Sequence, residues 1–168
     1  LIAYRMAEDA NVRLPAIVNF DGFYLSFTRE PVDIPGAEQC SMYLPEFDPG
    51  NLAFRAGHPV SEAIAVLGGG PYSYFRYEAH LAAQAARPVY DMAVDEFAKI
   101  FGRSYEAVET YRMEGAEVAF LMIGSFSTKA KAAVDELRAV GHSVGLVRTR
   151  LLRPFPEDDL RIRLAGLK

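Results

Sequence analysis

The clearest pattern of apolar and polar positions lies between residues 117 and 151. Residues 117–123 (EVAFLMI) form an apolar run of strand length, which predicts a strand covered on both faces. In residues 129–140 the apolar positions recur every three or four residues, which predicts an amphipathic helix that ends at Gly141. Residues 144–151 read as a second strand. This order predicts an α/β fold whose parallel sheet is connected by crossover helices.

The turn between the first strand and the helix, Gly124-Ser125-Phe126-Ser127-Thr128, has two interpretations. Backbone N–H groups at a helix N-terminus attract anions, so Ser125, Ser127 and Thr128 are candidate anion-binding residues. Alternatively, Ser127 or Thr128 caps the helix. The turn lacks the Gly-Lys-Ser/Thr of a phosphate-binding loop.

The first part of the chain predicts short elements around one loop. Residues 1–11 indicate the last turns of a helix, residues 14–20 a buried strand, and residues 37–44 a short helix or strand. Because α/β sheets keep their sites at the carboxyl ends of parallel strands, the loop after residue 20 is a candidate cofactor-binding or subunit-interface loop. Its candidate residues are Asp21, Ser26, Thr28 and Arg29. Alternatively, Asp21 caps a turn and Arg29 pairs with Glu30 or Asp33 at the surface.

The middle of the chain predicts a linker followed by a long helix. Prolines and glycines are dense in residues 45–71, and Gly68-Gly69-Gly70 indicates a joint because no Lys or Ser/Thr follows it in register. Residues 72–101 carry a sustained helical stripe, interrupted by Pro88, which predicts a kink or two helices that meet there. The aromatic residues at its start favour packing or a subunit interface over base stacking.

Three arginines follow the second predicted strand or lie near its end. Arg148 and Arg150 share one face of the strand, where they would bind an anion, pair with Glu117 or contact a partner. Arg153 is a further candidate anion-binding residue.

Composition excludes several functions. The chain has 168 residues, 51% of them hydrophobic, so a core can form, and its net charge of −4 argues against nucleic-acid binding. Its only cysteine, Cys40, excludes an internal disulfide and a cysteine-held metal or iron–sulfur cluster, and fits a reducing compartment such as the cytoplasm. The sequence contains no apolar run long enough to span a membrane, no metal-ligand spacing and no paired acid and base, so we name no metal ligand or catalytic residue.

The ends of the sequence predict a segment of a longer polypeptide. The first residues continue a helical pattern, and the last ones stop where another strand is expected.

Several segments together resemble a known family. Asp21-Gly22-Phe23-Tyr24-Leu25-Ser26, with Thr28 and Glu30-Pro31-Val32, is similar to the DGFxLSHTxEPV segment of the α subunit of 2-oxoacid:ferredoxin oxidoreductases, of which pyruvate synthase is the best-known type. The resemblance covers essentially the whole chain. Further matching segments are Phe75–Glu78, Phe101–Tyr105, Tyr111-Arg112, Gly124-Ser125, Ala132–Gly141, Gly145-Leu146 and Arg153–Pro156. The chain departs from the family at Phe27, where His is usual, and at Gly115, where an acidic residue is usual.

This resemblance implies a domain organisation. Residues 1–45 would be the C-terminal end of a pyrimidine-type thiamine-diphosphate-binding domain, and residues 46–71 a linker. Residues 72–168 would be a domain like the C-terminal domain of transketolase, truncated at its own C-terminus.

The resemblance also implies an activity for the complete complex. Such an enzyme oxidatively decarboxylates a 2-oxoacid to acyl-CoA on thiamine diphosphate with Mg²⁺, and passes electrons through [4Fe–4S] clusters to ferredoxin. Its β and other subunits, ferredoxin and coenzyme A are the implied partners, with no nucleic acid and no membrane. The family's cofactor-activating and substrate-contacting residues lie outside this chain, so it should bind no cofactor alone, be inert alone, and contribute subunit assembly and the cofactor and coenzyme A surroundings.

Two other functions remain open at this point. The chain could be a non-catalytic α/β docking or ligand-binding module, or part of another thiamine enzyme related to transketolase. Among 2-oxoacids, pyruvate is favoured because that branch of the family is the commonest.

Overall fold

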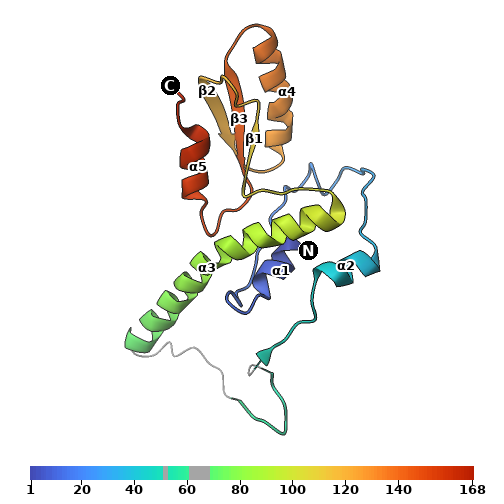
Figure 1. Cartoon of the computed structure of the whole chain (residues 1–168), viewed down its shortest axis with the longest axis vertical. Helices are drawn as coiled ribbons and strands as arrows, with labels where there is room; N and C mark the ends of the chain where they lie inside the picture. Colours follow the sequence, from blue (N-terminus) through green and yellow to red (C-terminus); the bar gives the residue numbers. More distant parts are fainter. Residues whose placement is uncertain (51–52, 61–68) are drawn as a thin grey trace.

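The computed structural model describes residues 1–50, 53–60 and 69–168, which form five helices and three strands within these ranges (Figure 1). In chain order the elements are α1 (Ile2–Ala7), α2 (Ala37–Tyr43), α3 (Gly69–Phe101), β1 (Val108–Tyr111), β2 (Val118–Met122), α4 (Phe126–Ala139), β3 (Val144–Thr149) and α5 (Glu157–Leu164).

The three strands form one sheet in the order β1-β3-β2. β2 and β3 are parallel, with Val118 opposite Val144, and α4 connects them. The predicted α/β fold with a parallel strand–helix–strand unit is therefore confirmed. β1 pairs with β3 in the antiparallel direction, so the sheet is mixed, a feature that the sequence did not predict. The likeness to the transketolase C-terminal domain stays a prediction.

One helix covers each face of the sheet (Figure 1). α4 buries Val134 against Val144 and Leu146 of β3, and α5 buries Leu160 against Val108 and Val147 on the other face. These two apolar clusters fix the position of α4, and hence of its N-terminus, relative to the strand ends.

β2 is only partly covered, so the prediction of a strand buried on both faces is wrong. It lies at an edge of the sheet, and the side chains of Val118 and Leu121 are 52% and 54% exposed. The apolar side chains of β2 point to both faces of the sheet. On one of its two edges, however, β2 pairs with no strand in the part of the chain that the structure describes.

The long helix α3 runs through Pro88 without a break. Its ribbon is continuous and changes direction along its length (Figure 1), so the kinked-helix expectation fits and the two-helix alternative does not. Val12 packs with Ala86 and Val89 on its C-terminal half. The Tyr43 hydroxyl donates to the Ala93 carbonyl over 2.9 Å, which holds α2 on the same helix.

Two predictions in the first part of the chain need correction. Residues 14–20 are not a buried strand: they pair with no strand among the described residues, and Ile17 is 85% exposed. α1 ends at Ala7, earlier than predicted. Residues 37–43 are helical, which decides between the two alternatives.

The predicted joint at residues 68–70 falls only partly within the structure. Gly68 lies outside the described residues, and Gly69 and Gly70 begin α3, where a joint was predicted.

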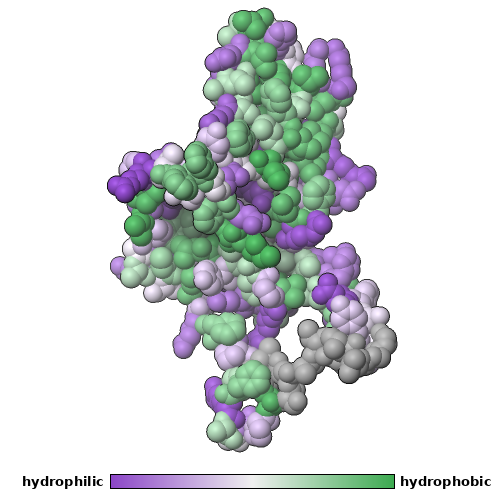
Figure 2. Space-filling model, turned by 180° about the vertical axis from the view of Figure 1, so that it is seen from behind, coloured by the Kyte–Doolittle hydropathy of each residue, from purple (hydrophilic) through white to green (hydrophobic). Residues whose placement is uncertain are grey.

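Exposed apolar side chains are frequent on this chain. Figure 2 shows them across the face opposite to that of Figure 1. In the irregular segment of residues 14–36, Ile17, Phe23 and Ile34 are all more than two thirds exposed. Contiguous exposed apolar surface of this kind is typical of regions that contact other protein.

Candidate functional site

A cavity of about 520 Å³ opens at the carboxyl ends of the parallel strands β2 and β3. This edge of an α/β sheet is where ligand sites are usually found. The cavity lies between the strand ends and the loop that follows residue 18. Its lining residues are Asn19, Phe20, Asp21, Leu25, Ile123, Gly124, Ser125, Thr128, Arg148, Thr149, Arg150 and Leu152.

Asp21 joins this loop to the start of α4. Its Oδ2 accepts a hydrogen bond from the Ser125 N–H over 2.6 Å, although the two residues are 104 positions apart. Hydrogen bonding from Ser125 lowers the pKa of Asp21, so the carboxylate is charged near neutral pH. The two predicted candidate groups, the loop of Asp21 and the turn of Ser125, therefore meet at one place.

Gly124 makes this approach possible. It has φ +74°, and a Cβ built on it would lie 3.1 Å from Asp21 Oδ2. A residue with a side chain would be strained in this backbone conformation and would also crowd the carboxylate.

The predicted cap of α4 is wrong. The helix begins at Phe126, with Ser125 at the N-cap, so Ser127 and Thr128 lie inside its first turn. The hydroxyl of the buried Ser127 donates back to the Gly124 carbonyl over 2.6 Å. The charge at the N-terminus comes from the distant Asp21, which sequence spacing could not reveal.

The other three loop candidates do not line the cavity. Ser26 Oγ accepts a hydrogen bond from the Phe23 N–H over 2.9 Å, and the Thr28 hydroxyl donates to the Tyr24 carbonyl, so both stabilise the local turn. Arg29 is exposed and forms no ion pair with Glu30, Asp33 or any other described residue.

Aromatic contacts support the Asp21 hydrogen bond. The rings of Tyr24 and Phe126 meet edge to face with centroids 5.1 Å apart, and Lys129 Nζ lies 4.0 Å from the Tyr24 ring centroid. The loop is thus held to the first turn of α4 by one charged hydrogen bond and one cation–aromatic cluster.

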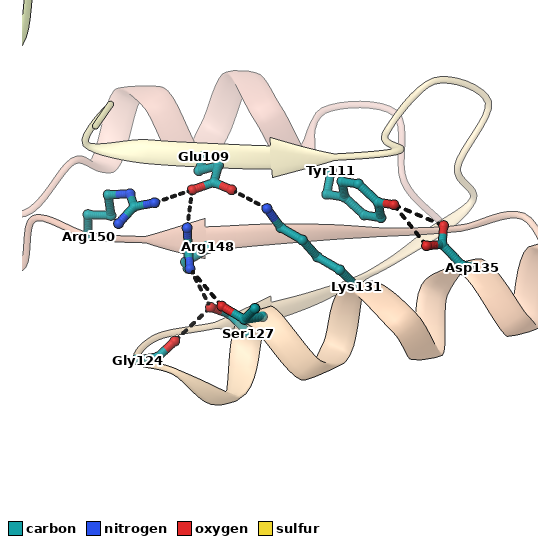
Figure 3. Close-up of polar contacts among 9 residues, drawn as sticks. Glu109, Tyr111, Gly124, Ser127, Lys131, Asp135, Arg148 and Arg150 are labelled. Atoms are coloured by element: carbon teal, nitrogen blue, oxygen red, sulfur yellow. Dashed lines mark hydrogen bonds and ion pairs between the residues drawn. The ribbon is translucent and has the colours of Figure 1, made fainter. Parts of the chain in front are cut away.

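A charged network lies beside the cavity (Figure 3). Glu109 on β1 binds three cations: Lys131 Nζ at 2.6 Å, Arg150 Nη2 at 2.5 Å, and Arg148, its cross-strand partner. Partial burial would raise the pKa of Glu109, but hydrogen bonds from Lys131, Arg148 and Arg150 together lower it to about 2. Sequence reasoning did not find Glu109 or Lys131.

Arg148 connects the network to the start of α4. Its Nη1 donates to Ser127 Oγ over 3.1 Å, while its Nε is buried without a hydrogen-bond acceptor among the described residues. The prediction that Arg148 and Arg150 share a strand face is confirmed, since both contact Glu109. Their alternative partner, Glu117, pairs instead with Lys168 at 2.9 Å.

Arg153 lies outside this site. It precedes Pro154 through a cis peptide bond, and its Nη1 donates to the adjacent Leu152 carbonyl. Of the candidate anion-binding residues, Ser125 and Thr128 line the cavity, whereas Arg153 and Ser127 do not.

The site suits the binding of a charged group better than proton transfer. Asp21 and Glu109, its two carboxylates, are both held in the charged form by hydrogen-bond donors, so neither is poised to exchange a proton near neutral pH. No group of three or more His, Cys, Asp or Glu side chains that could bind a metal occurs among the described residues. Within the same residues, no helix is both long and apolar enough to cross a membrane.

Comparison with known proteins gives consistent results. Residues 116–168 match the family described as pyruvate:ferredoxin oxidoreductase core domain II. The chain is 39% identical to pyruvate synthase subunit PorA of Methanothermobacter thermautotrophicus over 161 residues, 96% of this chain and 42% of that protein. It is 36% identical to PorA of Thermotoga maritima over its whole length, 43% of that protein.

A relative named for another substrate also matches. The alpha subunit of an NADH-dependent phenylglyoxylate dehydrogenase from Aromatoleum evansii is 32% identical over 179 residues, which cover 42% of that protein. The chain thus spans about two fifths of the length of these curated relatives. The similarities confirm the resemblance to the α subunit of pyruvate synthase-type enzymes, and they do not support the non-catalytic docking module.

Proposed function

We propose that this chain is a segment of the α subunit of a 2-oxoacid:ferredoxin oxidoreductase of the pyruvate synthase type. The observation that carries the proposal is the 39% identity to a PorA subunit across 96% of the chain. The complete complex would convert a 2-oxoacid, with pyruvate favoured, to acyl-CoA and carbon dioxide, and would transfer the electrons to ferredoxin.

The cofactors of that reaction would be bound elsewhere in the complex. Thiamine diphosphate with Mg²⁺ supplies the decarboxylation chemistry, and [4Fe–4S] clusters supply electron transfer. The residues here do not fit these groups: Cys40 is the only cysteine, and the hydroxyls of Ser26 and Thr28 are used in their own turn. We therefore assign no catalytic step to this chain.

The contribution of the chain would be assembly and the shaping of the cofactor and coenzyme A surroundings. Asp21 and the aromatic contacts hold the loop of residues 19–25 at the strand ends. In the longer segment of residues 14–36, Arg29 and several large apolar side chains stay exposed. Exposed apolar and arginine side chains are typical of interfaces, so this segment is the proposed contact to the β or other subunits.

The domain organisation and location follow from the same proposal. Residues 1–45 would complete a thiamine-binding domain, and residues 72–168 would form most of a transketolase C-terminal-like domain. The complex would be cytoplasmic.

A substrate panel on the parent complex tests the proposal. The complex that contains this chain would be purified and assayed for coenzyme A-dependent reduction of ferredoxin or viologen. Pyruvate, 2-oxoglutarate, a branched-chain oxoacid and phenylglyoxylate would be compared. We expect pyruvate to give the highest kcat/KM. Activity with only another oxoacid would support the proposed enzyme class and replace pyruvate as the substrate. No activity with any oxoacid would contradict the proposal.

A matched pair of variants tests the role of the loop. Arg29→Ala should lower the yield of assembled complex by about tenfold, the size of effect expected when one charged interface contact is lost. Arg161→Ala, on the exposed surface of α5, is the control and should assemble normally. Equal assembly of both variants would remove Arg29 from the proposed interface.

A further inference from the structure

We propose that the cavity at the carboxyl ends of β2 and β3 binds a small anionic group, a carboxylate or a phosphate, in exchange for the carboxylate of Asp21. Arg150 would bind the anion, and the Ser125 N–H would donate its hydrogen bond to the anion instead of to Asp21. This inference concerns the chain alone and does not depend on the oxidoreductase assignment.

The first argument is the charge beside the cavity. Among the described residues, Glu109 is the only carboxylate that contacts Lys131, Arg148 and Arg150, which leaves two positive charges in excess in this network. Arg148 and Arg150 also line the cavity, so the excess charge faces the space where a ligand would lie. An anion there would gain from both guanidinium groups.

The second argument is that Arg148 and Arg150 differ in how many of their N–H donors already have an acceptor. Arg148 is fixed by Glu109, Ser127 and Thr128, and its side chain is only 14% exposed. Arg150 has Glu109 as its one hydrogen-bond acceptor among the described residues, through Nη2 only, and its guanidinium carbon lies 5.1 Å from the Tyr105 ring centroid. Its remaining N–H donors are free for an incoming group, while the Tyr105 ring and Glu109 hold it in place.

The third argument is that this cavity already holds a carboxylate. Asp21 Oδ2 lies 2.6 Å from the Ser125 nitrogen, and Gly124 leaves room for it. Asp21 belongs to an irregular loop, so its carboxylate can move away from the Ser125 N–H without breaking a helix or a strand. An anion bound by Arg150 would repel Asp21 and take over its N–H donor.

The exchange predicts opposite effects for two substitutions. Asp21→Asn removes the competing charge and should tighten anion binding by about three- to tenfold, whereas Arg150→Gln should weaken it at least about tenfold, as expected for loss of a charged hydrogen bond. Arg161→Gln removes the same charge on exposed α5 and should bind as the unaltered chain does.

Titrations observed by amide NMR would test this. Inorganic phosphate and acetate would be added separately to the 168-residue chain at constant ionic strength, and the Ser125 amide shift and the dissociation constant would be followed. We expect saturation with at least one of the two anions and movement of the Ser125 resonance. Saturation with phosphate alone or with acetate alone would support the exchange and name its ligand class.

Several results would overturn the proposal. These are no saturation with either anion, equal affinity in Arg150→Gln, or unchanged or weaker binding in Asp21→Asn. The last result would make Asp21 a permanent cap of α4. Amide spectra of each variant would confirm that it is folded, so that lost binding reports on the site.

Discussion

At the scale of single residues, Glu109 bears on stability more than any other charged group of the site. Its side chain is 25% exposed and lies between three cations. Because the folded protein lowers its pKa from 4.5 to about 2, folding favours the charged form. The contribution of the charged Glu109 to the free energy of unfolding is fully present above about pH 4.5 and is lost as the pH falls toward 2.

Glu109→Gln should therefore change both stability and its pH dependence. At pH 7 the variant should unfold about 1–3 kcal/mol more easily, because three cations lose their shared carboxylate. Between pH 5 and pH 2 the difference between the two proteins should shrink, since the original chain loses this contribution by protonation. Urea unfolding at several pH values measures it, and a constant difference would contradict the assignment.

Gly124→Val tests the tight turn at the start of α4. The positive φ of Gly124 and the nearness of Asp21 predict a loss of about 1–3 kcal/mol in the free energy of unfolding. Gly57→Val is the matched control, because a Cβ at Gly57 meets no atom within 4 Å. A change of only a few tenths of a kcal/mol in urea unfolding of Gly124→Val would refute the strain argument.

At the scale of elements, Gly145 allows the turn after β1 to lie against β3. A Cβ at this position would lie 2.5 Å from Met113 Sδ and 3.0 Å from the Arg112 carbonyl oxygen. The Met113 side chain could move, but the backbone oxygen belongs to the turn and cannot easily do so. The close approach explains why a glycine lies in an otherwise buried β3.

Gly145→Ala should accordingly destabilise the sheet by about 1–3 kcal/mol, the usual cost of overpacking. Hydrogen exchange should show the loss as faster exchange in β1 and β3, while α3 keeps its protection. Gly57→Ala is the control. Uniformly faster exchange in both α3 and the sheet would show that the chain unfolds as one unit instead.

The elements that were predicted correctly depend on local periodicity. The β2–α4–β3 unit and α3 follow from spacing within each segment. β1 was missed because it has only four residues, and its antiparallel pairing to β3 has no local signal. For the same reason Glu109 was missed: its partners come together only through the register that sets it opposite Arg148.

The candidate site was predicted in part for a similar reason. Asp21 and Ser125 were each found because polar residues after apolar runs are recognisable in sequence. Their hydrogen bond was not, since it joins residues far apart in the chain. The prediction for residues 14–20 was wrong for a different reason. Their apolar content predicts a strand, but a strand also needs a partner for its backbone hydrogen bonds, and no strand pairs with them among the described residues.

At the scale of the whole molecule, the exposed segment of residues 14–36 separates α1 from α2. Arg29 is the only residue of this segment after which trypsin cuts, and it is exposed and lies outside every helix and strand. Limited trypsin digestion should therefore cut first after Arg29, well before Arg138 or Arg148, whose side chains are tied to the sheet region.

Mass spectrometry of early digestion products would identify the first cut. The two pieces should stay together at first, because Val12 and Tyr43 pack separately on α3. A first cut between β1 and β3 would show that the sheet, and not this segment, is the least stable part.

The uncovered side of β2 has a consequence for handling the protein. The side chains of Val118 and Leu121 on the two faces of this strand are exposed. The last residue lies beside the start of β2, where the Lys168 N–H donates to the Glu117 carbonyl over 2.8 Å (Figure 1). Beyond that bond, this edge of β2 pairs with no strand in the part of the chain that the structure describes, so a strand from another molecule can add to its backbone groups. Concentrated samples should therefore lose soluble protein faster than dilute ones, and a charged substitution at Leu121 should lengthen their storage life.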